Sequence, residues 1–279
     1  MKLAVSNIAW TKDVRLDAYA ILQNVGIRGL EVAPGLLFHA AEDPFSPPVE
    51  VAEDVMREIS YFGLSLVSMQ SLLFGAKGAA LFGSKAAQGA FRLGMRRAID
   101  LAGRFGIANL VFGSPKQRVV PDGLDAFRAQ QIAAELFRDL GDCAGRSKTI
   151  LSIEPNPQEY GTNFLTNCRQ ALEFVALVDH PSIGLNLDVG AIYMSGDFGD
   201  IEELIVSSAK TIHHVHISEP HLAPAPDDVE KTTRVLRALR NIDYQHWVSI
   251  EMRPDPANGL TTLEASIRKL VEAVQHARS

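Results

Sequence analysis

The chain lacks several features that mark whole classes of protein. It has only two cysteines, Cys143 and Cys168, which are too few for a disulfide framework and have no zinc-site spacing. No segment approaches the run of about 20 apolar residues that a transmembrane helix needs. The opening MKLAVSNIAW is too short in its apolar part for a signal peptide. We therefore expect a cytoplasmic protein with no membrane partner.

An excess of positive charge is also absent. The 27 lysines and arginines are outnumbered by 33 aspartates and glutamates, for a net charge of −6. Nucleic-acid binding needs a concentrated basic face, so we expect no nucleic-acid partner. The apolar content of 47% and the charged content of 22% are ordinary for a globular enzyme.

Short apolar runs alternate with longer amphipathic segments along the whole chain. The runs are bounded by Gly, Pro, Ser or Asn, as buried strands are. The expected strands are residues 2–8, 27–33, 64–70, 108–114, 149–155, 183–190, 211–218 and 247–253. The expected helices are residues 13–25, 50–62, 86–105, 125–146, 166–178, 200–210, 227–240 and 260 onward.

This alternation predicts an α/β fold, a (β/α)8 TIM barrel in which residues 1–279 form a single domain. The main competitor is an open, doubly wound sheet. That fold usually has a glycine-rich phosphate turn after its first strand, and SNIAWTKD is not such a turn.

The last four expected strands each end on a residue that can bind a metal. These residues are Glu154, Asp188, His216 and Glu251. In such a barrel the active site lies at the C-terminal ends of the strands, so all four belong to one rim. Side chains two apart share a face of a strand, so a second polar side chain points the same way in each strand. These partners are Ser152, Asn186, His214 and Ser249.

Each residue alone has an ordinary explanation. A strand-end glutamate usually takes part in a cap or a salt bridge, a histidine in a strand is usually a hydrogen-bonded core residue, and Asp188 can form an Asx turn. The four at matched depth are harder to explain in this way, because three carboxylates in one pocket repel each other unless a cation joins them. Three oxygen ligands and an imidazole suit one divalent ion, Mn²⁺, Mg²⁺, Co²⁺ or Zn²⁺.

At these positions the sequence resembles the xylose isomerase-like TIM barrels, which include sugar isomerases, ketose 3-epimerases, inosose dehydratases and endonuclease IV. The motifs are IEPNP with YGTNF, LDVG, HVHISEP and IEM, and the resemblance covers nearly the whole chain. It implies that Glu154, Asp188, His216 and Glu251 bind one divalent metal, as in the epimerase branch. It also implies that Glu154 and Glu251 are the catalytic acid and base.

The sequence departs from the family at three places. Ala191 stands where many members have a histidine three residues after the strand-six aspartate. Gln70 ends strand three, and Gly113 stands where endonuclease IV would have a histidine. The missing histidines argue against the trinuclear zinc site of a DNA-repair enzyme.

Other residues near the expected rim are candidates for substrate contacts. Cations there suit a phosphate or carboxylate on the substrate, and amides or a glutamate suit sugar hydroxyls. Trp10 and Phe74 are candidates for an apolar wall, and His221 is expected on the surface. The substrate-binding candidates are Asn156, Lys116, Arg118, His214, Arg253, Gln70 and Glu31.

These observations together predict a divalent-metal-dependent isomerase or epimerase of a sugar or sugar phosphate. The reaction would remove a proton next to a carbonyl and pass through an enediolate. The alternatives are a metal-dependent keto-inositol or keto-sugar dehydratase, a sugar-binding barrel without catalysis, and a metal-assisted phosphodiester hydrolase. Self-association is common in the family, so a homo-oligomer is a further expectation.

Overall fold

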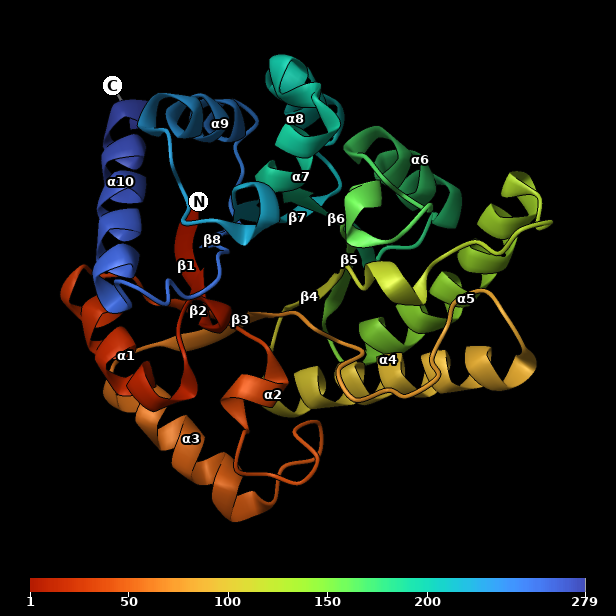
Figure 1. The fold of residues 1–279 in the computed structure, drawn as a ribbon, viewed down its shortest axis with the longest axis horizontal. Coiled ribbons are helices and arrows are strands. Elements are labelled where there is room, and N and C mark those ends of the chain that lie inside the picture. The colour runs from red at the N-terminus through yellow and green to blue at the C-terminus, as the bar shows by residue number, and fades with distance from the viewer. Residues whose placement is uncertain (279) are drawn as a thin grey trace.

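Eight parallel strands form the centre of the molecule in the computed structural model, which describes residues 1–278 (Figure 1). They follow one another in chain order, and β8 pairs with β1 to close the ring, so the predicted (β/α)8 barrel is confirmed. The strands are β1 (Lys2–Ser6), β2 (Gly29–Val32), β3 (Ser65–Met69), β4 (Asn109–Phe112), β5 (Ile150–Ile153), β6 (Ile183–Asp188), β7 (Ile212–Ile217) and β8 (Trp247–Ile250).

Helices surround the barrel, and all eight predicted helices are present. Two short helices, α2 and α7, were not predicted. The helices are α1 (Arg15–Asn24), α2 (Pro34–Leu37), α3 (Val49–Tyr61), α4 (Lys85–Phe105), α5 (Ala126–Arg146), α6 (Cys168–Val178), α7 (Val189–Ser195), α8 (Ile201–Ser207), α9 (Val229–Asn241) and α10 (Leu260–Arg278).

Polar side chains cap the starts of four of the long outer helices. Each cap oxygen accepts a hydrogen bond from a backbone N–H in the first turn, a group that would otherwise have no partner. The cap residues are Ser84 for α4, Asp125 for α5, Asn167 for α6 and Asp228 for α9.

Strand residues alternate between the helical layer and the barrel interior, as predicted. The apolar residues on the outer face are fully buried in the hydrophobic core. In the second half of the barrel these residues include Ile153, Leu187, Val215 and Ile250.

A chain of hydrogen-bonded polar residues crosses the barrel interior. The Ser152 hydroxyl donates to Asn109 Oδ1 over 2.6 Å, and Asn109 Nδ2 donates to Ser68 Oγ over 3.0 Å. The Ser68 hydroxyl then donates to Glu31 Oε1 over 2.8 Å. Branched apolar residues usually fill a TIM-barrel interior. Here β2 to β5 supply polar groups beneath the mouth, and these groups satisfy one another.

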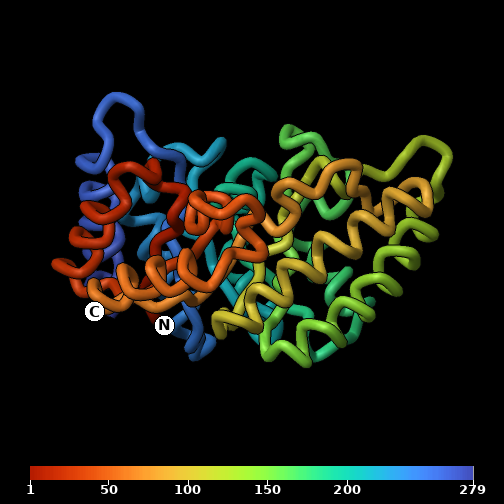
Figure 2. Tube along the Cα trace, turned by 90° about the horizontal axis from the view of Figure 1, so that it is seen from below, coloured from red at the N-terminus to blue at the C-terminus, as the bar shows by residue number. Residues whose placement is uncertain are grey.

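Both termini lie on one side of the molecule, opposite the loops that follow β4 and β8 (Figure 2). Those loops surround the C-terminal mouth of the barrel, where the predicted site residues lie. Among residues 1–278, the structure has no helix that is both long and apolar enough to cross a membrane.

Candidate metal centre and active site

Glu154, Asp188, His216 and Glu251 meet at the C-terminal mouth of the barrel, as predicted. Glu154 directly follows β5, Asp188 ends β6, His216 lies near the end of β7 and Glu251 directly follows β8. One possible ligand atom from each lies within 4.8 Å of the others. His216 Nδ1 is 3.1 Å from Glu154 Oε1, 3.2 Å from Glu251 Oε2 and 3.5 Å from Asp188 Oδ2.

Two amide side chains fix the carboxylate of Glu154. Asn186 Nδ2 donates to Glu154 Oε1 over 2.8 Å, and Asn156 Nδ2 donates to Glu154 Oε2 over 3.0 Å. Asn186 lies on β6 and Asn156 on the loop after β5, so the carboxylate is held from two sides. Hydrogen bonds to both oxygens fix the orientation of the carboxylate at the mouth of the barrel.

Asp188 has two roles. Its Oδ1 accepts the backbone N–H of Ala191 over 2.6 Å, which makes Asp188 the N-cap of α7, and it also accepts the Ser218 hydroxyl over 3.0 Å. Its Oδ2 faces His216. Oδ1 therefore serves the turn at the start of α7, and Oδ2 is left as the oxygen that could bind the predicted metal.

Glu31 on β2 orients the imidazole of His216. His216 Nε2 is 3.1 Å and 3.0 Å from the two Glu31 oxygens, so it donates its proton to them, and Nδ1 then faces the three carboxylates. Glu31 is fully buried and also lies 3.6 Å from His214 Nε2. A buried carboxylate on the far nitrogen is the usual partner of a histidine that binds a metal.

The electrostatics of the cluster favour bound positive charge. Burial raises the pKa of Glu251 to about 7, although the charge of His216 and its hydrogen bond act in the opposite direction. Burial alone would lower the pKa of His216, but the charges of Glu251 and Glu31, together with hydrogen bonds to Asp188 and Glu154, hold that pKa well above its usual value. Buried carboxylates that lie close together repel one another, and a divalent cation bound between them would remove this repulsion. The donor set therefore fits a metal.

Gly113, just after β4, leaves the space that this arrangement needs. A Cβ at this position would lie 2.5 Å from Glu154 Oε2 and 3.3 Å from Asn156 Oδ1. Any side chain here would displace the Glu154 carboxylate, so glycine is required for a close approach. Gly113 stands where endonuclease IV would have a histidine, and the close approach of Glu154 gives a structural reason for glycine at this position.

Two adjoining cavities open above the cluster. The first has a volume of about 140 Å³, and its lining includes Glu154, Asp188 and Glu251 together with Asn156 and Tyr160. The second has about 320 Å³ and extends over β3 and β4. The two share three lining residues, Ser114, Pro115 and Glu154.

Of the predicted substrate contacts, Asn156 and Gln70 line these cavities. Asn156 Oδ1 is buried and has no hydrogen-bond partner among the described residues, so it can accept a bond from a ligand. Gln70 lines the larger cavity, and its Nε2 donates to Ser6 Oγ over 2.5 Å. Lys116 and Arg253 are exposed and line neither cavity, so their roles stay predictions.

Three other predicted substrate contacts are corrected by the structure. Arg118 is fully buried, and its Nη1 donates to the backbone carbonyl of Glu154 over 2.8 Å. Glu31 and His214 are fully buried beneath the cluster, where His214 Nε2 lies 2.9 Å from Ser249 Oγ. None of the three lines either cavity, so each supports the site from below and does not reach a substrate.

The aromatic candidates divide in a similar way. Trp10 is buried and packs edge-on against Tyr19, so it is a core residue. Phe74 is 58% exposed and lines the larger cavity. His221 is exposed, as predicted.

Among the residues that line the smaller cavity, those that sequence reasoning missed include Tyr160, Ser218 and Glu219. All three lie inside the motifs that carried the family resemblance, YGTNF and HVHISEP. The motifs therefore marked these positions in the sequence, but the direction in which each side chain points depends on the geometry of its loop.

Comparison with known proteins supports the family resemblance. Residues 19–274 match the family model described as xylose isomerase-like TIM barrel. The chain belongs to this family. A ketose 3-epimerase from Arthrobacter globiformis is 24% identical over 256 residues, which cover 90% of this chain and 83% of that protein.

Solved structures show the same barrel. The 3-keto-D-glucoside 4-epimerase from E. coli matches with a TM-score of 0.79 at 16% identity, covering 97% of this chain and 99% of its own. A D-psicose 3-epimerase from Clostridium cellulolyticum H10 also matches with a TM-score of 0.79, at 14% identity, covering 100% and 98%. At such low identity these structures establish the fold alone. The prediction that the chain is a sugar isomerase or epimerase agrees with the family match and with the Arthrobacter relative.

Proposed function

We propose that this xylose isomerase-like barrel is a divalent-metal-dependent epimerase or isomerase of an unphosphorylated sugar. The observation that carries the proposal is the convergence of Glu154, Asp188, His216 and Glu251 beneath an open cavity. Proteins similar to this chain include ketose 3-epimerases, which supports the reaction class.

The four residues would hold the ion through three carboxylate oxygens and His216 Nδ1. A bound divalent ion supplies a Lewis acid that polarises a carbonyl and the neighbouring hydroxyl. Asn186 and Glu31 would keep the donor atoms pointed at one place, because each bonds a ligand residue from outside the cluster. Oxygen-rich ligands with one imidazole are compatible with Mn²⁺, Mg²⁺, Co²⁺ or Zn²⁺.

Glu154 and Glu251 would move the proton. They follow β5 and β8, so they approach a bound sugar from different parts of the mouth, and both line the smaller cavity. One would remove the proton from the carbon next to the carbonyl and the other would return it from the opposite side. Epimerisation and isomerisation share this first step, and the position to which the proton returns decides between them.

The cavity linings favour a neutral substrate. The smaller cavity is lined by four carboxylates, those of Glu154, Asp188, Glu219 and Glu251, and neither lining contains a lysine or arginine. A phosphate group carries between one and two negative charges at neutral pH and would be repelled there. The cations that were expected to hold a phosphate are exposed or buried elsewhere.

Solvent-deuterium exchange tests the proposal directly. The metal-loaded protein is incubated in D₂O with a panel of free ketoses and with D-fructose 6-phosphate, and the sugars are examined by mass spectrometry and NMR. We expect one deuterium in a free ketose and slower exchange into the phosphate. Glu154→Gln and Glu251→Gln should each lower the rate by about 100-fold or more, whereas Glu159→Gln, an exposed glutamate nearby, should not.

The same experiment distinguishes the alternatives. Loss of one water from the substrate would identify a dehydratase. Sugar binding without exchange, and with unchanged affinity in the Glu154 and Glu251 variants, would identify a binding protein without catalysis. Metal analysis of the purified protein and of Asp188→Asn tests the ligand assignment, and an unchanged metal content in the variant would refute it.

A further inference from the structure

The larger of the two cavities has no role in the reaction described above. At about 320 Å³ it is more than twice the volume of the 140 Å³ cavity over the carboxylate cluster. Its lining comes from the loops after β3 and β4, and it meets the smaller cavity along Ser114, Pro115 and Glu154. A substrate that reacts at the cluster can therefore extend into this space.

Gly113 lies next to the boundary between the two cavities, beside the shared residues Ser114 and Glu154. Gly113 lines the larger cavity, and the space that its missing side chain leaves is bounded by Glu154 Oε2 and Asn156 Oδ1. Asn156 is 6% exposed, and its Oδ1 has no hydrogen-bond partner within residues 1–278. A buried acceptor without a partner costs free energy unless a ligand supplies a donor, and a sugar hydroxyl is such a donor.

The larger cavity is polar and nearly uncharged. Apart from Glu154, its polar side chains are two glutamines and two serines, and no cation lines it. The Gln117 side-chain amide forms no hydrogen bond to any of the described residues, so both its donors and its acceptor are available to a ligand. Hydroxyl and amide groups of this kind recognise a polyhydroxylated, neutral molecule.

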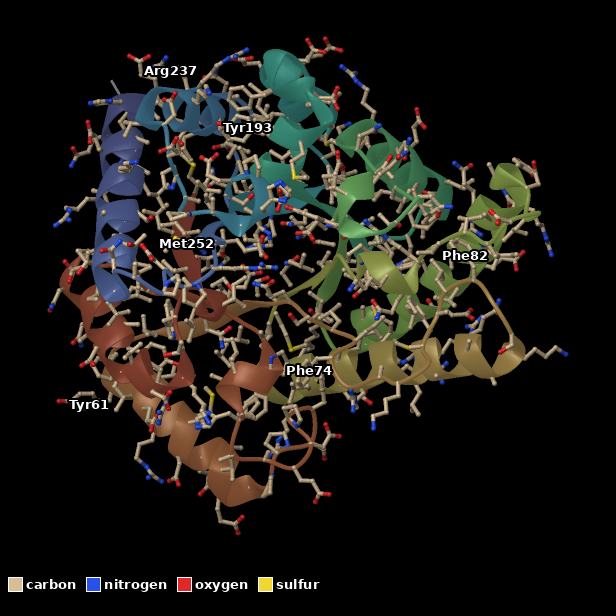
Figure 3. All side chains as sticks on the ribbon, viewed as in Figure 1. Tyr61, Phe74, Phe82, Tyr193, Arg237 and Met252 are labelled. Atoms are coloured by element: carbon tan, nitrogen blue, oxygen red, sulfur yellow. The ribbon has the colours of Figure 1, made fainter. Side chains whose placement is uncertain are left out.

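One exposed aromatic ring forms the outer wall. Phe74 is 58% exposed, which is unusual for a phenylalanine, and it lies beside α2 in Figure 3. Its ring packs close to Gly35, where a Cβ would come within 2.9 Å of it, and Arg97 Nη2 donates to its backbone carbonyl over 2.8 Å. The ring is thus held in place, and its open face can pack against the C–H groups of a sugar ring.

We propose that this cavity is a second sugar subsite, so that the substrate is a keto sugar with a second neutral sugar unit attached. The inference rests on the proposed function, because the reacting unit occupies the cavity over Glu154 and Glu251. The attached unit lies over Gly113, stacks on Phe74 and bonds Gln117, while Asn156 bonds the reacting unit in the smaller cavity.

Pairs of sugars that differ only by the second unit test this proposal. The metal-loaded protein is given D-fructose with maltulose and palatinose, and 3-keto-D-glucose with 3-ketotrehalose, and kcat/KM for solvent-deuterium exchange is measured for each. We expect at least one disaccharide to exceed its monosaccharide by tenfold or more. Phe74→Ala should lower that ratio at least fivefold, and Gln117→Ala should lower it in the same direction.

An exposed phenylalanine elsewhere provides the matched control. Phe127 on α5 is 69% exposed and lines neither cavity, so Phe127→Ala should leave the disaccharide-to-monosaccharide ratio unchanged. No preference for any disaccharide would overturn the subsite, and so would a Phe74→Ala variant that loses activity equally on both members of a pair.

Binding measurements separate this proposal from the proposed function. If no sugar exchanges deuterium, the proposed function fails, and calorimetry of the same sugars with the metal-loaded protein still decides the subsite. Tighter binding of a disaccharide, weakened by Phe74→Ala, would support a binding site for two sugar units. Equal binding of both sugars in every pair would refute it.

Discussion

Replacing Gly113 with alanine places a methyl group where the structure has no room for one. The new Cβ would lie 2.5 Å from Glu154 Oε2, whereas ordinary contacts of a Cβ begin at 3.4 Å. The carboxylate must therefore move by about 1 Å. Because Asn186 and Asn156 both hold it by hydrogen bonds, the movement also disturbs these bonds.

The effect should be large on the site and small on the fold. A misplacement of about 1 Å in a catalytic group can lower the rate by about 100-fold, and a disturbed ligand shell lowers metal affinity by about 10-fold to 100-fold. Gly113 does not have the positive φ that would forbid a side chain. We therefore expect the free energy of unfolding to change by less than about 1 kcal/mol.

Calorimetric metal titration, deuterium exchange and urea unfolding of Gly113→Ala measure these three quantities. Gly199→Ala is the control, because a Cβ at Gly199 meets no atom within 4 Å. Glu154→Asp in the Gly113→Ala background shortens the side chain and should restore part of the metal affinity. Wild-type metal affinity and exchange rate in Gly113→Ala would show that Glu154 does not take part as described.

Three further predictions concern groups beneath or away from the mouth. Glu31→Gln should weaken metal binding by about 10-fold to 100-fold, because it removes the charge that orients His216, and metal titration with exposed Glu53→Gln as control checks this. Arg118→Met should lower the free energy of unfolding by about 1–3 kcal/mol in urea, since it removes the Arg118 donor from the buried Glu154 carbonyl, whereas the Leu165 carbonyl keeps the Asn156 N–H; an unchanged midpoint would contradict this. Burial and the nearby His246 lower the pKa of His213 to about 4, so its stabilising contribution is complete above pH of about 6.5 and is lost as the pH falls toward 4. Because the ring is partly exposed, wild type should lose only about 1 kcal/mol more than His213→Gln between pH 7.5 and pH 5 in urea unfolding, and parallel losses would refute the assignment.

The fold and the convergence of the four candidate metal ligands were predictable because they depend on local pattern. Apolar runs marked the strands, and a residue at a strand end must reach the mouth of a closed barrel, so Glu154 and Glu251 could be placed without coordinates. The period of two along β6 placed Asn186 beside Asp188 on the interior face.

The errors concern residues whose environment is set by distant parts of the chain. Arg118 stands in the polar loop segment GSPKQR, which looks exposed, yet the loop after β5 folds over it and supplies the Leu165 carbonyl. Glu31 seemed to be available to a substrate, but its partner His216 is 185 residues away in the sequence. No local pattern reveals either contact.

The two-sided bonding of Asp188 makes the acidic residues of the cluster unequal. One oxygen begins α7 by accepting the Ala191 N–H, and the other faces the imidazole. Aspartate is a preferred residue at the start of a helix, and its short side chain can bond the turn that follows. A glutamate at this position would keep the charge but has a longer side chain. From the same backbone position, its two oxygens could not both reach the Ala191 N–H and the His216 imidazole. Substitutions that alter this group of carboxylates therefore have more freedom at Glu251, whose backbone is tied to no helix start, than at Asp188.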